Sequence, residues 1–263
     1  MSKQPTIGFI GVGGIASALV RGICTGGMET PVVLSPRNAN RAAALAAQFT
    51  DQVRVARDNQ EVVDTTDWVF VSVLPGQGEA VLRPLRFRPE QKVVSVITGK
   101  PLSLVSSWIG GPVAKILCIT PLPCVEHRVG PIILHPRNPE AEALFAPLGE
   151  IVAVDSEWEA EVLRAIAGLV ASTYALIDRI VGWSVDQGIP ELSAKAYTAS
   201  LISGLCESAI RAPEGGLKHL IADNTPGGYN EMTVRLLTEA DAFNLWAGSL
   251  DAILERQKNP NRD

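Results

Sequence analysis

A glycine-rich segment near the start of this 263-residue sequence is the clearest candidate for chemistry. Gly11, Gly13 and Ala16 fit the pattern GxGxxA and directly follow the apolar run Thr6–Ile10. The first glycine allows a tight turn, the second lets a phosphate approach the backbone, and the alanine lets a helix pack closely on a strand. The pattern therefore predicts a dinucleotide site, and the alternative is a tight strand-to-helix turn that binds nothing.

The helix expected after this turn supplies the rest of the phosphate site. Gly14 and Ile15 stand in its first turn, where N–H groups lack intrahelical partners and the helix dipole is positive. We expect these N–H groups to hold the pyrophosphate of a bound dinucleotide.

The end of the second predicted strand indicates which dinucleotide binds. An NAD site usually has a carboxylate there, but none lies between Thr30 and Thr50. Instead Ser35, Arg37 and Asn38 offer hydrogen-bond donors, and a guanidinium can bind a phosphate with two parallel bonds. These residues favour NADP(H), although Arg37 could also be an ordinary solvated charge.

The elements that position these residues alternate between strand and helix. Such alternation predicts a Rossmann-type α/β fold around a mostly parallel sheet. The expected strands are Thr6–Ile10, Val32–Leu34, Trp68–Val73, Lys92–Ile97, Lys115–Ile119, Ile132–Leu134 and Glu150–Val154. The expected helices are Gly14–Thr25, Asn40–Phe49, Gly78–Leu85 and Leu102–Trp108.

After Asp155 the pattern becomes entirely helical. We therefore expect a dinucleotide-binding domain over residues 1–155 and an all-α domain over residues 156–263, for substrate and dimerisation. The expected helices are Glu157–Gln187, Leu192–Ile210, Leu217–Ala222, Pro226–Leu237 and Ala240–Lys258.

The helical half contains small-residue and apolar helix faces that must pack against other helices. Small residues, which let helices approach closely, recur at Ala165, Ala167, Gly168, Ala171, Ser172 and Ala175. The last helix gathers Phe243, Trp246, Ala247, Leu250 and Leu254 on one face. We expect a homodimer or a higher homo-oligomer; the alternative is a core helix covered within a monomer.

A second candidate site precedes the fourth helix of this half. Thr225 is a plausible N-cap, Pro226 suits the first helical position, and Gly227 and Gly228 follow. Glycines inside a helix cost up to about 1 kcal/mol each relative to alanine, and bare N–H groups there suit an anion. The segment predicts a binding site for a substrate carboxylate. The alternative, an ordinary capped turn, fits these residues equally well.

Several catalytic mechanisms are excluded because this sequence lacks the residues that they require. Tyr174, Tyr197 and Tyr229 are not followed by lysine four positions on, and no GxSxG is present. Reduction of a ketone needs a proton donor, whereas an imine can arrive already protonated. The absence of an evident acid therefore favours reduction of a C=N bond.

Composition excludes other classes. With 46% apolar and 19% charged residues the chain is a globular protein, and its net charge of −5 with scattered basic residues argues against nucleic acid. The longest uncharged apolar stretch, residues 165–177, is short for a membrane span, and no signal peptide is evident. Four cysteines without CxxC and three histidines without a zinc pattern predict a cytoplasmic protein without a metal.

The motifs taken together resemble the pyrroline-5-carboxylate reductase family. The segments GFIGVGGIASALVRGI, DWVFVSVLPGQGEAVL, KVVSVITGKPLSLVSSWIG and NTPGGYNEMTVRLL occur in that family's order and spacing, over nearly the whole chain. The resemblance implies a Rossmann domain, an interlocked helical dimer and NAD(P)H-dependent reduction of 1-pyrroline-5-carboxylate to proline. It places Val73, Leu74 and Pro75 on the cofactor side.

The resemblance also assigns the loop before the fourth helix. The family's Ser-Pro-Gly-Gly-Thr-Thr loop corresponds to residues 225–230, so Thr225, Gly227, Gly228 and Asn230 are implied to bind substrate. Thr225 keeps the hydroxyl, and Asn230 stands where the family has its imine-side threonine; both are implied to act in catalysis.

Departures from the family pattern leave three functions open. Val73-Leu74-Pro75-Gly76 replaces Val-Lys-Pro-Gln, and Ile119–Pro123 loses an asparagine near the nicotinamide. The chain is thus similar to a divergent family member. It is a proline-forming reductase, a related reductase for another imine or carbonyl, or a non-catalytic NADP-binding regulatory protein.

Overall fold

A computed structural model describes residues 4–113 and 115–258, and it divides into two compact units. The first unit ends at Arg164 and the second begins at Ala165. The last strand ends at Ala153, close to the expected change from sheet to helices near residue 155. The expected assignment of a binding domain and a dimerisation domain stays a prediction.

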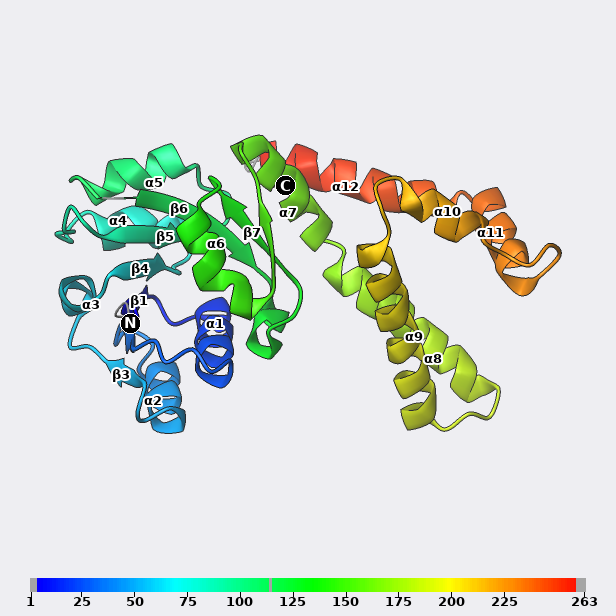
Figure 1. Cartoon of the computed structure of the whole chain (residues 1–263), viewed down its shortest axis with the longest axis horizontal. Helices are drawn as coiled ribbons and strands as arrows, with labels where there is room; N and C mark the ends of the chain where they lie inside the picture. Colours follow the sequence, from blue (N-terminus) through cyan, green and yellow to red (C-terminus); the bar gives the residue numbers. More distant parts are fainter. Residues whose placement is uncertain (1–3, 114, 259–263) are drawn as a thin grey trace. The chain divides into compact units, whose positions relative to one another are not determined.

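The first unit contains an eight-stranded sheet in the order β3-β2-β1-β4-β5-β6-β7-β8 (Figure 1). Every neighbouring pair is parallel except β6 and β7, so the expected α/β fold with a mostly parallel sheet is confirmed. The strands are β1 Ile7–Ile10, β2 Val32–Leu34, β3 Val53–Val55, β4 Trp68–Val71, β5 Lys92–Ser95, β6 Lys115–Pro121, β7 Pro131–His135 and β8 Glu150–Ala153.

Helices cover both faces of this sheet. Alternate strand residues point to opposite faces, so Phe9 packs with α1, α2 and α6 whereas Ile10 packs with α3. The helices of the unit are α1 Gly14–Thr25, α2 Ala39–Gln48, α3 Asn59–Thr65, α4 Gly78–Leu82, α5 Leu102–Ile109 and α6 Pro139–Phe145. Short 3-10 turns are η1 Pro75–Gln77, η2 Pro123–His127 and η3 Ala146–Leu148.

Aromatic side chains form the centre of the larger core layer. The rings of Phe9 and Phe70 lie 4.8 Å apart, and Phe145 meets Phe70 edge-on at 5.6 Å. Trp68 meets Phe145 in the same edge-on manner at 6.0 Å. Such pairs add about 0.5–1.5 kcal/mol each beyond the area they bury. They fix β1, β4 and α6 relative to one another, and β1 carries the glycine-rich turn.

Sequence patterns did not predict β3, α3 or α6. β3 has only three residues and buries only Val53. α3 has seven residues, and it begins because the Asp58 carboxylate accepts the Glu61 N–H at 2.8 Å. Both elements are too short for a periodic signal, so capping and sheet pairing define them.

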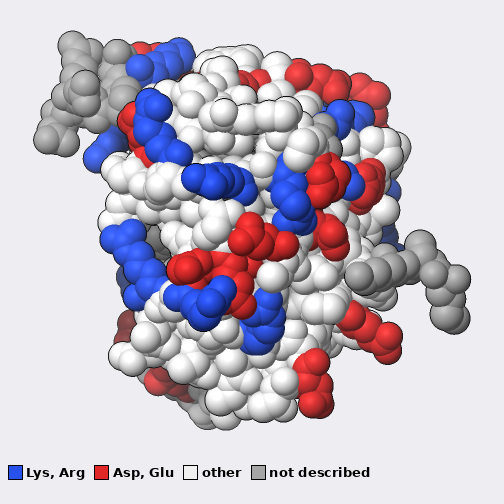
Figure 2. Space-filling model, turned by 90° about the vertical axis from the view of Figure 1, so that its left-hand side faces the viewer, with Lys and Arg blue, Asp and Glu red and all other residues white. Residues whose placement is uncertain are grey.

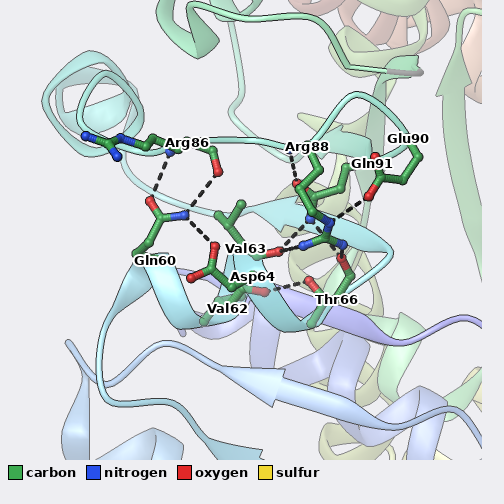
Figure 3. Close-up of polar contacts among 9 residues, drawn as sticks. All are labelled: Gln60, Val62, Val63, Asp64, Thr66, Arg86, Arg88, Glu90 and Gln91. Carbon is green, nitrogen blue, oxygen red and sulfur yellow. Dashed lines mark hydrogen bonds and ion pairs between the residues drawn. The ribbon is translucent and has the colours of Figure 1, made fainter.

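Side chains from a later segment close the end of α3 (Figure 3). The fully buried Gln91 amide donates to the carbonyl oxygens of Val63 and Thr66 at 2.6 and 2.8 Å. The Arg88 guanidinium donates to the same two oxygens. These bonds satisfy carbonyls that the helix cannot pair internally and tie α3 to the start of β5.

Charged side chains of both signs are mixed on the face drawn in Figure 2. Among the ion pairs of the first unit, Arg54 and Arg57 both bind Glu61, and Lys92 binds Glu140 at 2.6 Å. Lys92 also lies 5.0 Å from the centre of the Trp68 ring.

The second unit is helical, as expected. Its elements are α8 Val170–Asp186, α9 Glu191–Arg211, α10 Gly216–Ala222, α11 Tyr229–Glu239 and α12 Ala242–Lys258, preceded by α7 Glu157–Ala167 across the boundary. The single helix expected over residues 157–187 is wrong, because residues 168–169 form a turn between α7 and α8. At this turn Gly168 packs against Ile253, where a side chain would collide with the isoleucine.

The helices of this unit leave large apolar side chains exposed. Tyr197 and Ile210 of α9 are 73% and 74% exposed, and Leu245 of α12 is 70% exposed. Over the described residues, the stretch Glu157–Asp186 is long and apolar enough, by length and composition alone, to cross a membrane. The uncharged apolar run over residues 165–177 is itself too short to span a membrane, and the longer stretch includes the charges of Asp178 and Arg179. Only 11% of its most apolar window is buried.

Candidate cofactor and substrate sites

A cavity of about 710 Å³ opens at the carboxyl ends of β1, β2, β4 and β5. Its volume lies in the range of small-molecule sites, and its place is where doubly wound sheets bind nucleotides. It collects nine of the ten expected cofactor residues: Gly11, Gly13, Gly14, Ile15, Arg37, Asn38, Val73, Leu74 and Pro75. Ser35 does not line it.

The glycine-rich turn has the geometry that a phosphate needs. Gly11 has a φ of +90°, and any side chain there would collide with the carbonyl oxygen of Ser72. A Cβ on Gly13 would meet nothing within 4 Å, so the backbone there faces open space. Ala16 is fully buried under the sheet layer, which brings the start of α1 close to β1. A pyrophosphate therefore fits against this turn.

The start of α1 carries no negative charge. Its N-cap is Gly13, no side chain caps it, and its first turn holds no acidic residue. The N–H groups of Gly14 and Ile15 therefore remain available to an anion. A guanidinium nitrogen of Arg41 lies 3.8 Å from the point where a Gly14 Cβ would stand, and adds positive charge beside them.

Ser35 and Asn38 both hold the turn, but only Asn38 also lines the cavity. Ser35 is fully buried, and its hydroxyl accepts the Gly11 N–H at 2.9 Å. The Asn38 side chain donates to the Val12 carbonyl at 3.2 Å. Ser35 was expected to offer a hydrogen-bond donor to the cofactor, and this is corrected because burial keeps its hydroxyl out of the cavity. Both residues connect the end of β2 to the glycine-rich turn.

Arg37 supplies the only charge among the residues that line the cavity. Its side chain is exposed, and one guanidinium nitrogen donates to the Gln77 side-chain oxygen at 3.2 Å. No aspartate or glutamate lines the cavity. Its electrostatics therefore favour an anionic ligand at the end of β2.

The sequence did not single out seven other lining residues: Val12, Ala39, Asn40, Ser72, Gln77, Val96 and Thr98. All follow the carboxyl ends of β1, β2, β4 or β5 within a few positions. The rule that ligands bind at that edge of a parallel sheet could have found them.

The loop before α11 differs from its expected form. The helix begins at Tyr229 with Gly228 as N-cap, and not at Pro226 with Thr225 as N-cap. Gly227 has a φ of +71°, and the Gly228 N–H donates to the Thr225 carbonyl at 2.9 Å. A tight turn therefore precedes the helix, because glycine at this position accepts a left-handed conformation.

The Glu231 carboxylate accepts the Gly227 N–H at 2.6 Å. This bond uses one of the N–H groups expected to hold a substrate carboxylate, and Glu231 stands where sequence reasoning assigned no role. A cavity of about 400 Å³ beside the loop is lined by Ile221, Ala222, Asn224, Pro226, Glu231, Val234 and Arg235. Thr225, Gly227, Gly228 and Asn230 do not line it.

The side chains expected to act in catalysis, Thr225 and Asn230, are exposed. Neither makes a hydrogen bond to another residue in the part of the chain that the structure describes. Both are therefore available to a substrate, and their roles stay predictions.

The clearest pKa shifts lie outside these sites. The Arg57 backbone N–H and the Arg57 and Arg54 guanidiniums lower the pKa of Glu61 to about 2. Burial raises the pKa of the Cys24 thiol to about 11. Over the described ranges, no three His, Cys, Asp or Glu side chains gather to hold a metal ion.

The comparisons with known proteins agree with this geometry. Residues 6–99 match the family model described as NADP oxidoreductase, coenzyme F420-dependent. The pyrroline-5-carboxylate reductase of Pseudomonas aeruginosa is 23% identical over 98% of this chain and 94% of its own. That of Escherichia coli is 25% identical over 90% and 91%.

Solved structures share the fold along the whole chain. A pyrroline-5-carboxylate reductase from Coxiella burnetii has a TM-score of 0.84 at 21% identity, covering 99% of this chain and all of its own. The Plasmodium falciparum pyrroline carboxylate reductase, solved with NADP bound, has a TM-score of 0.80 at 19% identity and covers 97% of each chain.

The parallel sheet, the glycine-rich turn and the family match define the chain as an NAD(P)-dependent oxidoreductase. Within that class it resembles the pyrroline-5-carboxylate reductases along nearly its full length. The identities of 23% and 25% make this a distant resemblance.

Proposed function

We propose that this protein reduces a C=N bond with NADPH, and that its substrate is 1-pyrroline-5-carboxylate, which becomes L-proline. The observation that carries the proposal is the make-up of the cavity at the sheet edge. It joins a phosphate-binding turn to one uncompensated arginine and contains no carboxylate. The names of the relatives support the substrate class.

The lining of the cavity also favours an imine over a ketone. Apart from Arg37, no lining residue has a side chain that titrates, so the cavity walls offer no general acid. An alkoxide formed from a ketone would need such an acid, whereas a protonated imine brings its own proton. A C=N substrate therefore fits these walls better than a carbonyl.

The residues of the first unit fit NADPH. The N–H groups of Gly14 and Ile15 would hold the pyrophosphate, and Arg37 would bind the 2′-phosphate. When bound, the reduced nicotinamide supplies a hydride. Val73, Leu74 and Pro75 would line its binding space and limit water there.

The loop before α11 would bind the substrate. The Gly227 and Gly228 N–H groups already donate within the protein, so the N–H groups at the start of α11 and the Thr225 hydroxyl would hold the substrate carboxylate. Asn230 would donate a hydrogen bond beside the reacting nitrogen. These roles follow the resemblance of residues 225–230 to the family loop.

The Glu231–Gly227 bond favours a second candidate function. A carboxylate of the protein already accepts an N–H of the proposed anion seat, and two carboxylates repel each other. The same enzyme would then reduce a cyclic imine without a carboxylate, for which Glu231 offers attraction to the iminium charge.

One assay separates these functions. NADPH oxidation is followed with 1-pyrroline-5-carboxylate and with 1-pyrroline, the same ring without the carboxylate. Faster turnover of 1-pyrroline-5-carboxylate supports proline formation. Faster turnover of 1-pyrroline supports reduction of an imine without a carboxylate. NADPH binding without turnover on either imine would contradict both and favour a regulatory protein.

We also propose that the helical unit is covered by a second copy of the chain, in a homodimer or a larger homo-oligomer. The exposed apolar side chains of α8, α9 and α12 support this, as do the small side chains within positions 165–175. So many large apolar side chains left exposed in one unit suggest a surface that another chain covers. A cytoplasmic location, and the absence of nucleic-acid and membrane partners, remain predictions.

A further inference from the structure

Arg37 and Gln77 meet across the cavity from two different loops. Arg37 follows β2, and Gln77 ends the 3-10 turn η1 after β4. The Arg37 guanidinium donates to the Gln77 side-chain oxygen at 3.2 Å, and both residues line the same cavity. The contact therefore fixes a long, exposed side chain that would otherwise sample many rotamers.

The partner of Arg37 is neutral. Arg54, Arg83 and Arg235 each pair with a glutamate, which compensates their charge. Arg37 has no carboxylate within 4 Å among the described residues. An amide oxygen orients a guanidinium but leaves its full charge and its remaining N–H donors to an anion.

The backbone of Gln77 is itself held in place. Its N–H donates to the Leu74 carbonyl at 2.8 Å. The next residue, Gly78, is buried against the Trp108 ring, and a side chain at Gly78 would collide with that ring. Packing on α5 therefore anchors the residue that orients Arg37.

We propose that Gln77 is a positioning residue for cofactor selection, which holds Arg37 ready for the 2′-phosphate of NADPH. This rests on the proposed function, because it requires that NADPH is the cofactor. Gln77 lowers the entropy cost of ordering the Arg37 side chain when the cofactor binds. It therefore strengthens the preference for the phosphorylated ribose, although it does not touch the reacting atoms.

The test measures binding of two fragments by calorimetry: 2′,5′-ADP, which carries the 2′-phosphate, and 5′-AMP, which lacks it. For Gln77→Ala we expect 2′,5′-ADP to bind about three- to tenfold more weakly and 5′-AMP to bind within about twofold of the wild type. In an Arg37→Ala background the same change should add nothing, because Gln77 acts through Arg37.

Two further variants complete the design. Gln77→Glu keeps the shape but gives Arg37 a carboxylate partner, so 2′,5′-ADP should bind more weakly than to Gln77→Ala. Gln48→Ala is the matched control, since Gln48 accepts a hydrogen bond from Arg21 and does not line the cavity. It should leave both fragments unchanged.

The outcomes are distinct. Equal weakening of both fragments by Gln77→Ala, or no weakening of either, would overturn the proposal. So would an added loss in the Arg37→Ala background. A wild-type protein that binds 5′-AMP as tightly as 2′,5′-ADP would contradict the NADPH preference itself, and thereby the proposed function as well.

Discussion

The Ser35 hydroxyl accepts the Gly11 N–H at 2.9 Å, and this bond connects the end of β2 to the glycine-rich turn. Ser35 is fully buried and does not line the cavity, so its hydroxyl holds the turn. Two residues of one short segment thus have different tasks: Ser35 shapes the phosphate site, whereas Arg37 faces the cavity.

Ser35→Ala should weaken NADPH and NADH by the same factor. The change leaves the partly buried Gly11 N–H without its partner, and an unpaired donor costs up to about 1–3 kcal/mol when fully buried. We expect about a tenfold loss for each cofactor, measured by fluorescence titration, with a lower melting temperature. A loss of affinity confined to NADPH would contradict this role and would indicate that Ser35 contacts the 2′-phosphate.

Arg37→Ala should weaken NADPH selectively. A charge-assisted contact contributes about 1.5–3 kcal/mol, so NADPH affinity should fall about ten- to hundredfold while NADH affinity hardly changes. The same titration measures both. Equal loss for the two cofactors would show that Arg37 does not bind the 2′-phosphate.

Asn230→Ala and Gly228→Val should separate chemistry from substrate binding. If Asn230 donates to the reacting nitrogen, kcat should fall by more than KM rises. Gly228→Val should crowd the anion seat and raise KM while NADPH binding is kept. Steady-state kinetics measures both effects, with circular dichroism to verify folding. An Asn230→Ala enzyme within about twofold of wild type would indicate an ordinary exposed residue.

The helical unit should bring two chains together. Light scattering at micromolar concentration should give at least about twice the 28.0 kDa of one chain. A second copy is expected because Tyr197, Ile210 and Leu245 would otherwise remain in water. A folded and active monomer at that concentration would contradict the proposed assembly.

Glu61 should contribute stability that depends on pH. Its pKa falls from 4.5 to about 2 in the folded chain, because Arg57 and Arg54 donate hydrogen bonds to its carboxylate. A lowered folded-state pKa gives stability above pH 4.5 that is lost as the pH falls toward 2. Urea unfolding should therefore show wild type more stable than Glu61→Gln at pH 7, with the difference shrinking across that window. A difference that stays constant would exclude the carboxylate charge as its cause.

The sequence predicted the parts of the fold that leave a periodic or motif signal. Gly14–Thr25 and Val32–Leu34 have the same bounds in the structure, because an apolar face or a buried strand defines each. The nucleotide cavity was predictable since GxGxxA requires a defined turn. The roles of Ser35 and Gln77 were not, because they depend on contacts over 24 and 40 positions of sequence separation.

The loop before α11 shows a different limit. Its proline and glycines predicted a turn at a helix start, but the left-handed Gly227 moves that start to Tyr229. The Glu231 carboxylate then reaches back to the loop, a contact that no spacing rule for the family motif contains. The motif spacing therefore predicted the cofactor half more fully than the substrate half.

The most direct measurement of the central proposal follows a deuterium label from cofactor to product. NADPH deuterated at both C4 positions is incubated with the protein and 1-pyrroline-5-carboxylate, and the product is analysed by mass spectrometry. The proposal predicts proline carrying one deuterium, at the carbon that formed the C=N bond. Proline absent, or formed without deuterium, would contradict reduction of this imine by NADPH.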